Sequence, residues 1–500
     1  MHDSPTLTQF GGNVEFKLRD KHLKKYPHFD QLISTSELVD IITDPERVAT
    51  NAFLPLLQYV KSYQPFRDPG NRPKKKERLI RYASRRDSTV FSYYRHQLAE
   101  KYEERLVALG IHDIPIAYRK IPLGDGSESG KCNIDFANDL FMSIRECQSC
   151  SVVALDIRKY FESIDHRRLY QIWCELIGVE KLPPDHLAVF KAITRYRFVD
   201  RSAAYARLGY IGEKLQPNGT KALGYLVPHK KMPKQLCSPE DFRAKIAGND
   251  PQYDSLIQEN SNDHGIPQGA PISDLLANAY LLAFDVGLAT YVRARGGRYW
   301  RYSDDLVLVL PGDGDVGPEA ASYVESLISN FGDALKIKAS KTSIGRFVLR
   351  DDGTHEYQHV AGDGGADGIQ YLGFRFDGRC AYIRNSTLSN FYRKITRRAR
   401  RQAAKHVARF DGKDRAWLLD HFDFHSFEER FGRVRDFESV ASPRGWTFWT
   451  YAKRASERFG PMGDPILRQV SRYRRYVRRA VADEIDRQLV LRSRDGSLDQ

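Results

Sequence analysis

The chain has 500 residues, 41% of them hydrophobic and 12% aromatic, so it is long enough for several domains and too apolar for extensive disorder. No apolar run reaches the roughly 20 residues that span a bilayer, the start lacks the pattern of a secretory signal, and the scattered cysteines predict a reduced, cytoplasmic protein without a membrane anchor. The net charge of +14 favours a polyanionic partner.

The first third of the chain predicts a basic hairpin between helical segments. The first 60 residues predict a mostly helical N-terminal extension. Residues 61–86 place turn residues before alternating basic and apolar positions, which predicts a basic β-hairpin. A helix is expected over 88–110, a β-branched strand opens the segment 151–161, and another helix is expected over 166–178.

The rest of the chain alternates between short strands and helices. Residues 200–262 are polar with weak periodicity and predict an insertion, whereas 272–294 predicts one strong amphipathic helix. The remaining elements are expected in this order: a hairpin over 296–312, a helix near 319–334, short strands around 345–350 and 369–383, and basic helices from 386 onward.

Three aspartates carry the strongest chemical signal. Asp156 ends an apolar strand, and Asp304 and Asp305 follow 148 residues later at the end of another. Converging carboxylates can hold two Mg²⁺ ions about 3.5–4 Å apart for phosphoryl transfer. Such ions would also remove the repulsion between the adjacent carboxylates. The alternative is a solvated turn that happens to contain two aspartates.

The segments around these aspartates resemble the motifs of reverse transcriptases, the bacterial enzymes above all. Three segments are similar to palm motifs: YSDD (302–305), ALDIRKYFESIDH (154–166) and GIPQGAPISDLLANAYL (265–281). KASKTSIGRF (338–347) and YLGFRFDG (371–378) fall where the family has its lysine-bearing motif and its primer-grip hairpin. KKKERLIRYASRRD (74–87) resembles the fingers hairpin. AYRK (117–120) and NIDFANDLF (133–141) are most similar to the defence-associated unknown-group and abortive-infection classes.

The resemblance implies an α+β right-hand polymerase fold. An N-terminal extension (1–60) would precede fingers (61–150) and a palm (151–383) of antiparallel sheet and helices, with an insertion at about 200–262. An all-helical, basic thumb and C-terminal region (384–500) would follow.

The resemblance also implies a role for individual residues. Two Mg²⁺ ions, or Mn²⁺ in their place, would be held by Asp156, Ile157, Asp304 and Asp305, with Asp305 as the weaker ligand, and Lys341 would protonate the departing pyrophosphate. The deoxynucleoside triphosphate would contact Lys75 (or Lys74), Arg78, Phe161, Gln268 and Gly269. Phe161 would exclude a ribose 2′-OH. Primer and template would contact Tyr302, Tyr371, Leu372 and Gly373.

Arginines of the C-terminal region are spaced to follow a nucleic-acid backbone. One group comprises Arg393, Arg397, Arg400 and Arg401, and another comprises Arg468, Arg472, Arg475 and Arg479 at intervals of four, three and four. Tyr473 and Tyr476 lie among the second group and are candidates for a protein hydroxyl that primes DNA synthesis.

The function predicted from these features is RNA-templated DNA synthesis in antiviral defence. The partners would be a non-coding template RNA, the DNA product, deoxynucleoside triphosphates and, in a homo-oligomer, further copies of the chain. The alternatives are a retron-type or group II intron-type enzyme, an RNA-templated RNA polymerase, and an RNA-binding scaffold without catalysis. Phe161 argues against the RNA polymerase, and the three carboxylates argue against the scaffold.

Overall fold

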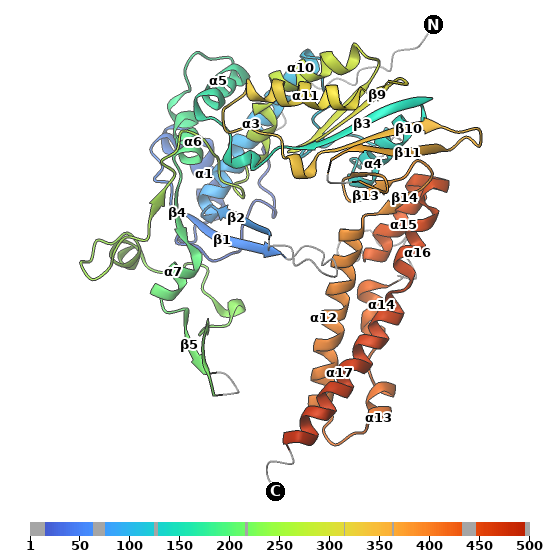
Figure 1. Cartoon of the computed structure of the whole chain (residues 1–500). Helices are drawn as coiled ribbons and strands as arrows, with labels where there is room; N and C mark the ends of the chain where they lie inside the picture. Colours follow the sequence, from blue (N-terminus) through green and yellow to red (C-terminus); the bar gives the residue numbers. More distant parts are fainter. Residues whose placement is uncertain are drawn as a thin grey trace.

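The computed structural model describes residues 16–63, 76–124, 129–215, 219–314, 316–362, 365–432 and 447–495. The predicted fold class is confirmed: antiparallel sheets and helices form an α+β body, and the C-terminal region is helical (Figure 1). Within the described ranges no single helix is long and apolar enough to cross a membrane, although one bent pair, Ser273–Tyr280 with Leu282–Arg293, meets that test by length and composition.

The region predicted to form the fingers contains the expected basic hairpin, and we call its sheet the fingers sheet. Strands β1 (Leu56–Tyr63) and β2 (Lys76–Tyr82) pair antiparallel. The sheet continues through β4 (Arg197–Asp200), which pairs parallel with β1, and β7 (Gln258–Glu259), which pairs with β4. The ends of the expected insertion therefore belong to the fingers sheet. Strands of four and two residues are too short to show a period in the sequence.

Helices cover the N-terminal part of the chain. The described helices there are α1 (Thr35–Thr43), α2 (Pro45–Ala49), α3 (Arg85–Ala108) and α4 (Asn133–Arg145). Residues 16–34 are irregular, so the predicted helical extension is confirmed only for 35–49. The predicted helix α3 begins after Ser84, whose hydroxyl accepts a hydrogen bond from the Asp87 backbone and caps the helix.

A five-stranded antiparallel sheet, in the order β11-β10-β3-β9-β8, forms the region predicted to be the palm, and we call it the palm sheet. Its strands are β3 (Ser149–Asp156), β8 (Arg298–Tyr302), β9 (Asp305–Pro311), β10 (Ser343–Leu349) and β11 (His355–Ala361). The central strand β3 is buried almost throughout, because α11 lies over one face of the sheet and α4 lies on the other (Figure 1). Burial on both faces explains its continuous apolar sequence.

The palm helices are α5 (His166–Ile177), α6 (Pro184–Thr194), α9 (Ser273–Tyr280), α10 (Leu282–Arg293) and α11 (Gly317–Ser329). The prediction of one amphipathic helix over 272–294 is wrong, because α9 and α10 meet at an angle of 46°. Seven of the eight α9 side chains are buried, so this helix lies inside the core and has no polar face.

The segment between β4 and β7 forms a projecting unit. It contains α7 (Arg201–Arg207), β5 (Ile211–Leu215), β6 (Lys221–Tyr225) and α8 (Pro239–Asp241). Its base packs against the fingers sheet in a small apolar cluster that includes Leu57, Val199, Tyr205, Leu236 and Ile246.

A small three-stranded sheet connects the palm to the C-terminal helices. It consists of β12 (Ile369–Tyr371), β13 (Phe374–Phe376) and β14 (Ala381–Ile383). The helices that follow are α12 (Asn385–Arg409), α13 (Arg415–Asp420), α14 (His425–Phe431), α15 (Phe448–Phe459), α16 (Asp464–Ser471) and α17 (Tyr473–Asp495). The long helices α12 and α17 lie side by side and project away from the palm (Figure 1).

Candidate active site

The three predicted aspartates lie together at one end of the palm sheet. Asp156 is the last residue of β3 and pairs in register with Asp305, the first residue of β9. Asp304 lies in the turn between β8 and β9, and its carbonyl accepts a hydrogen bond of 2.9 Å from the Ile157 backbone. Antiparallel pairing of Asp156 with Asp305 therefore brings together residues that are 149 positions apart in sequence.

Burial and mutual repulsion raise the pKa of two of these carboxylates, Asp304 and Asp305. Burial, with the charge of Asp156 next in importance, raises the pKa of Asp304. The pKa of Asp305 rises to about 7 because it is buried and faces both Asp304 and Asp156. A cation bound among these carboxylates would favour their charged forms and offset the effect of burial.

The turn that carries Asp304 rests on a buried polar network. Ser303, at the first position of the turn, has a left-handed backbone with φ 61°, a conformation that two-residue hairpin turns require. The Ser303 carbonyl accepts a hydrogen bond from Nη1 of Arg301 (3.3 Å). Arg301 is fully buried and pairs with Asp285 (Nη2–Oδ2 2.6 Å), which also accepts from the Tyr299 hydroxyl. Its Nη2 donates to the Asn278 carbonyl (3.0 Å).

Tyr118 is a residue of this site that the sequence did not single out. It has a left-handed backbone (φ 62°), and its hydroxyl lies 3.5 Å from Oγ of Ser303. Arg95 donates to the Tyr118 carbonyl (3.2 Å) and holds Asp274 with two further hydrogen bonds. A positive φ in a non-glycine residue is costly and clusters at functional sites. The only sequence signal was the resemblance of the AYRK segment.

Two predicted cationic residues lie beside the carboxylates. The Lys341 ammonium forms an ion pair with Asp156, and the Asp156 carbonyl accepts from the Lys338 backbone (2.8 Å). Lys341 belongs to a single 3₁₀ turn, Ala339–Lys341. Arg78 is exposed on β2, and its charge acts to lower the pKa of Asp304. Lys75, the other predicted phosphate contact on this hairpin, lies outside the described residues.

The carboxylate oxygens of Asp156, Asp304 and Asp305 are ligands of the kind that Mg²⁺ prefers. In the part of the chain that the structure describes, no group of three or more His, Cys, Asp and Glu side chains is arranged to hold a metal ion by itself. Mg²⁺ commonly takes only one or two carboxylates and completes its shell with water and substrate phosphates. The raised pKa of Asp304 and Asp305 and the Lys341 ion pair on Asp156 mark a site that needs positive charge.

The predicted nucleotide-contacting residues lie on segments that border this site. Phe161 is half-buried, and its carbonyl accepts from the Ile266 backbone (2.8 Å), which joins the first and second motifs. The Gln268 carbonyl accepts from the Arg81 backbone (3.0 Å). Gly269 has φ 130°, and a Cβ there would lie 2.6 Å from the Arg81 carbonyl. Glycine is therefore required where this loop approaches β2.

The predicted primer-contacting residues form a tight hairpin. Leu372 (φ 45°) and Gly373 (φ 95°) are both left-handed and join β12 to β13, as in a type I′ turn. Tyr371 is buried, and its hydroxyl has no hydrogen-bond partner among the residues that the structure describes. Burial raises the pKa of Tyr371, with the charge of Asp305 as the next cause. Tyr302, half-buried, faces the Tyr118 ring at 6.4 Å.

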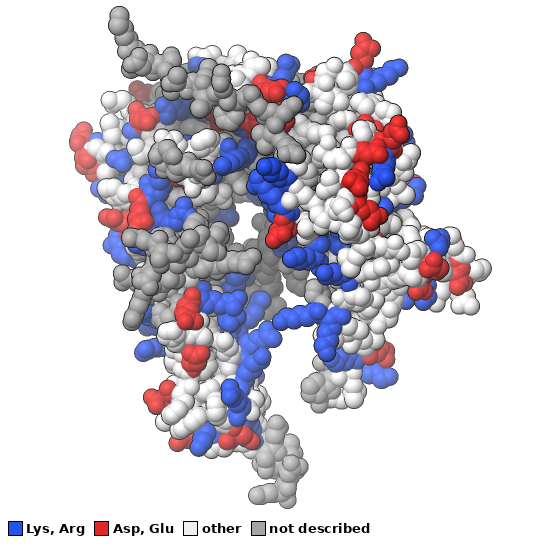
Figure 2. All heavy atoms as spheres, turned by 180° about the vertical axis from the view of Figure 1, so that it is seen from behind, with Lys and Arg blue, Asp and Glu red and all other residues white. Residues whose placement is uncertain are grey.

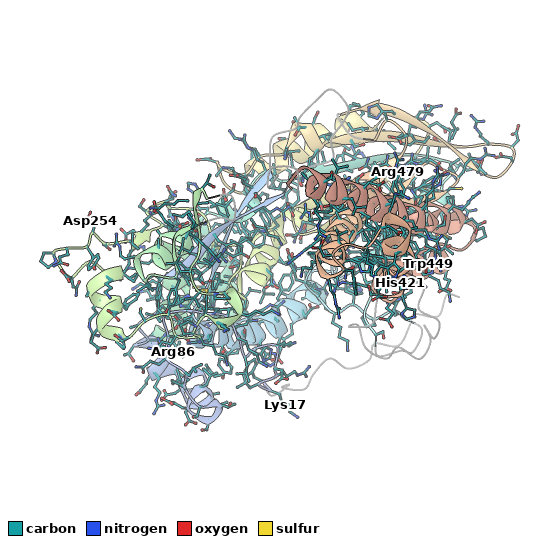
Figure 3. All side chains as sticks on the ribbon, turned by 90° about the horizontal axis from the view of Figure 1, so that it is seen from below. Lys17, Arg86, Asp254, His421, Trp449 and Arg479 are labelled. Carbon is teal, nitrogen blue, oxygen red and sulfur yellow. The ribbon has the colours of Figure 1, made fainter. Side chains whose placement is uncertain are left out.

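The C-terminal arginines are largely solvent-exposed, but one predicted alignment is wrong. Figure 2 shows Lys and Arg side chains around a hollow between the C-terminal helices and the fingers. Arg393 is half-buried. The other seven predicted arginines are exposed: Arg397, Arg400, Arg401, Arg468, Arg472, Arg475 and Arg479. Arg468 belongs to α16, whereas Arg475 and Arg479 belong to α17, so the second group does not lie on one helix. Figure 3 shows Arg479 on α17.

The two candidate priming tyrosines differ in exposure. Tyr473 is only 3% exposed and packs in the C-terminal core near Trp449, so its hydroxyl is not offered at the surface. Tyr476 is 47% exposed and packs against the Tyr392 ring at 4.6 Å. The prediction of a priming hydroxyl now concerns Tyr476 alone.

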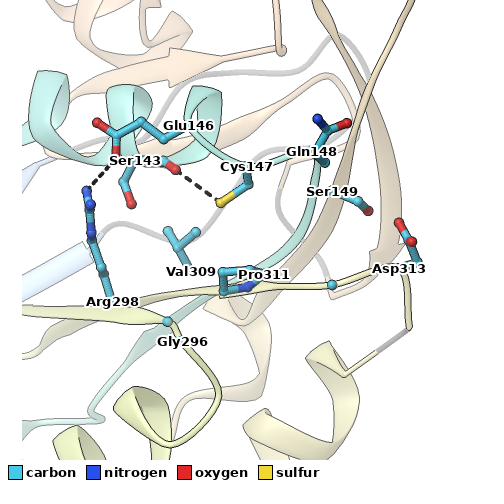
Figure 4. Close-up of a pocket in the computed structure, with 12 residues that line it drawn as sticks. Ser143, Glu146, Cys147, Gln148, Ser149, Gly296, Arg298, Val309, Pro311 and Asp313 are labelled. Atoms are coloured by element: carbon cyan, nitrogen blue, oxygen red, sulfur yellow. Dashed lines mark hydrogen bonds and ion pairs between the residues drawn. The ribbon is translucent and has the colours of Figure 1, made fainter.

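A separate cavity of about 530 Å³ lies at the other end of the palm sheet (Figure 4). It is lined by the first residue of β3, Ser149, and the last residue of β9, Pro311, together with Cys147 and Arg298. Cys147 Sγ contacts the Ser143 carbonyl (3.3 Å), and Arg298 pairs with Glu146 (2.8 Å). These strands carry the aspartates at their opposite ends, so this cavity is separate from the carboxylate site.

No family model matches the sequence, and no curated protein matches it. Among solved structures, the chain is similar to a truncated apo telomerase from Candida tropicalis (TM-score 0.31, 9% identity, 68% of this chain and 58% of that one). It is also similar to a Candida albicans telomerase in complex with a telomeric RNA fragment (TM-score 0.34, 10% identity, 90% and 65%). The chain thus spans less than two thirds of the length of either. Such values assign no activity, so the function is inferred from the side chains of the site.

Proposed function

We propose that this protein is an RNA-templated DNA polymerase. The observation that carries the proposal is the convergence of Asp156, Asp304 and Asp305 at the paired ends of β3 and β9, with Arg78 and Lys341 as the adjacent cations. A solvated aspartate turn would not bury its carboxylates or raise their pKa as strongly as occurs at Asp305. The same convergence disfavours a scaffold without catalysis.

The residues of the site divide the work of nucleotidyl transfer. Asp156, Asp304 and Asp305 would hold two Mg²⁺ ions, which would supply charge stabilisation for the attacking and leaving oxygens. Arg78 would contact triphosphate oxygens, because guanidinium groups bind phosphate through two parallel hydrogen bonds. Lys341 would leave Asp156 and donate a proton toward the pyrophosphate. Phe161 would exclude the 2′-OH of a ribonucleotide.

The biological setting belongs to the same proposal. The likeness of AYRK (117–120) and NIDFANDLF (133–141) to defence-associated enzymes supports a cytoplasmic antiviral role with a non-coding RNA template. A retron-type or group II intron-type enzyme would share the site and copy a different RNA. Purification with bound nucleic acid, followed by sequencing of the RNA and the DNA, separates these roles, because each copies a different template.

The test of catalysis is DNA synthesis by the Asp304→Asn variant. Primer extension is measured on a poly(rA)–oligo(dT) substrate with Mg²⁺ and with Mn²⁺. Synthesis is expected to fall by more than roughly a hundredfold, because Asn keeps the shape of Asp304 but removes a metal-binding charge. The thermal midpoint should stay equal or rise, since the change relieves repulsion within the cluster.

Asp313→Asn is the matched control. Asp313 is exposed beyond the far end of β9, at the cavity of Figure 4, and the same charge is removed without touching the carboxylate site. Its DNA synthesis should equal that of the unmodified protein. Equal synthesis by Asp304→Asn, or a wild-type protein that binds RNA but never extends a primer, would reject the polymerase proposal.

A further inference from the structure

The ribbon formed by β5 and β6 stands apart from the other described strands. The two strands pair over Ile211–Leu215 and Lys221–Tyr225 and form a sheet of their own. We refer to residues 208–238, without 216–218, as the arm. Figure 1 shows β5 near the end of the arm, which projects from the fingers on the same side as the C-terminal helices.

The base of the arm is fixed, so its position is defined. The Tyr210 hydroxyl donates to the Leu236 carbonyl (2.6 Å), and the Leu226 backbone donates to the Tyr210 carbonyl (2.9 Å). Met232 and Leu236 are buried in the apolar cluster that also holds Val199 of the fingers sheet. The arm is therefore anchored at its base and exposed at its end.

One face of the ribbon exposes large apolar side chains. Register places Leu215, Leu223 and Tyr225 on the same face, and they are 68%, 77% and 39% exposed. The Glu213–Lys221 ion pair (3.3 Å) lies on this face between them. A two-stranded hairpin is at best marginally stable in water on its own. Large apolar side chains exposed on one face of such a ribbon, with an ion pair between them, mark a surface that contacts another molecule.

The charge of the arm identifies the class of that molecule. Residues 208–238 contain five lysines and a single acidic residue, Glu213. All five lysines are exposed: Lys214, Lys221, Lys230, Lys231 and Lys234. The surface therefore combines phosphate-binding charge with an aromatic ring and apolar side chains, which is the combination that binds unpaired nucleotides.

We propose that the arm is a docking surface for the template RNA outside the active site, an inference that rests on the proposed function. Lys221, which would exchange its exposed partner Glu213 for a phosphate, would contact the RNA backbone on the apolar face, and Lys214, which the register places on the opposite face beside Ala222, would contact it at the other side of the ribbon. Leu215, Leu223 and Tyr225 would cover bases that are unpaired. The Lys and Arg side chains around the hollow in Figure 2 would extend this phosphate binding beyond the arm.

The test is RNA binding by the full-length protein. The probe is a fluorescein-labelled stem-loop RNA with a single-stranded 3′ tail, measured by fluorescence anisotropy between 50 and 200 mM salt. In Lys214→Gln/Lys221→Gln, the affinity for the RNA should fall about tenfold. The slope of log K against log salt, where K is the association constant for the RNA, should decrease in magnitude by about 1.5, because each lost phosphate contact removes about 0.7–0.9. Leu215→Ser/Leu223→Ser should weaken binding with little change in that slope.

Arg293→Gln/Arg295→Gln is the control for charge. These residues lie at the C-terminal end of α10, and they pair with Asp113 and Glu319 on the side of the palm sheet away from the arm (Figure 1). Their affinity for the RNA should be unchanged. If Arg293→Gln/Arg295→Gln lost as much RNA affinity as Lys214→Gln/Lys221→Gln, the arm would not be a specific binding site.

Two further measurements test whether the arm binds a second copy of the chain instead of RNA, and whether the arm proposal stands independently of the polymerase proposal. If light scattering shows that Leu215→Ser/Leu223→Ser dissociates an oligomer while RNA affinity is kept, the occupant is a second copy and the RNA proposal is wrong. Primer extension is measured on the same preparations. If the protein extends primers but binds RNA equally well without the arm side chains, only the proposal for the arm is wrong. If RNA binding depends on the arm but no primer is extended, only the proposed polymerase function is wrong.

Discussion

At the scale of single residues, Phe161 links the first motif to the loop of the second. It follows Asp156 by five positions and lies in the 3₁₀ turn Tyr160–Glu162, where its carbonyl holds the Ile266 backbone. Its ring is half-buried and packs near Tyr160, with ring centroids 5.9 Å apart. A ring fixed at both its backbone and one face can act as a rigid wall, whereas a mobile side chain would yield to a 2′-OH.

Replacement of Phe161 by Ala is expected to admit ribonucleotides. The ratio of kcat/KM for UTP to that for dTTP should rise roughly tenfold to a hundredfold, since the wall discriminates by steric exclusion alone. Single-nucleotide incorporation on poly(rA)–oligo(dT) measures the ratio, and kcat/KM for dTTP itself reports any general damage. An unchanged ratio with normal dTTP use would show that Phe161 is an ordinary packing residue.

His28 is a titratable residue that is completely buried. Its Nδ1 accepts from the Phe29 backbone (2.8 Å) and lies 3.9 Å from Asp30 Oδ1, which pairs with Arg85 (3.2 Å). Complete burial lowers the pKa of His28 to about 4, although Asp30 opposes the shift. Below about pH 6.5 the unfolded chain takes up a proton that the folded chain excludes until about pH 4.

The free energy of unfolding should therefore fall as the pH drops from about 6.5 toward 4. The contribution of His28 is about 2–3 kcal/mol at pH 4.5, at about 1.4 kcal/mol for each unit of pKa. Urea unfolding at pH 7 and pH 4.5 measures this loss. It should shrink in His28→Asn and persist in His421→Asn, the exposed histidine labelled in Figure 3. If the free energy of unfolding depended equally on pH in His28→Asn and His421→Asn, His28 would not be the source of the loss.

At the scale of elements, the β8–β9 hairpin depends on helices α9 and α10. Arg301 of β8 is the only residue that donates both to the turn, through Ser303, and to Asn278 and Asp285 of these helices, as far as the described residues show. The hairpin is thus held at its turn by a buried ion pair and not by local strand pairing alone. Removing one partner would leave a buried charge uncompensated, at a cost of about 3–5 kcal/mol.

The double variant Asp285→Leu/Arg301→Met separates folding from positioning. Replacing a buried ion pair by apolar groups of similar volume is often neutral or stabilising by about 1–4 kcal/mol, so the protein should fold. The turn loses the donor to Ser303, and kcat for primer extension should fall roughly tenfold to a hundredfold while KM for dTTP stays within about twofold. An unchanged kcat in a stable double variant would limit Arg301 to a structural role.

The sequence predicts elements that have a strong local pattern. The apolar runs before Asp156 and after Asp304 give β3 and β9, and Gly178 ends α5 with a left-handed backbone at φ 71°. The break between α9 and α10 is not predictable from the pattern, because a helix buried on all sides is apolar all round. The Asp285–Arg301 pair joins residues 16 positions apart on different elements, so no helical or strand period relates them.

At the scale of the whole molecule, the sequence predicts which regions are basic but not how they face one another. The spacing of the arginines from Arg468 to Arg479 predicts one helix, whereas α16 ends at Ser471 and α17 begins at Tyr473. The burial of Tyr473 depends on its packing near Trp449, which lies 24 positions earlier. Figure 2 shows the result: Lys and Arg side chains from the fingers and the C-terminal helices meet around one hollow. Tertiary packing, which has no local sequence signature, creates this surface.

The exposed arginines of α12 should set the salt dependence of RNA binding. Arg397, Arg400 and Arg401 are exposed, and none of the ion pairs among the described residues includes them. Their triple replacement by Gln should reduce the slope of log K against log salt by about 2–2.7 and weaken binding equally for unrelated RNA sequences, because phosphate contacts carry no sequence information. The stem-loop RNA probe and a scrambled version measure both effects.

Three paired arginines of the same helical region provide the control. Arg415 pairs with Asp486, Arg487 with Glu484 and Arg492 with Asp411. Replacing all three by Gln removes the same total charge, but from side chains that are already neutralised by an acid and held away from a ligand. A smaller change in slope is therefore expected for the control than for the α12 variant. Equal changes would mean that net charge, and not the α12 surface, governs RNA binding.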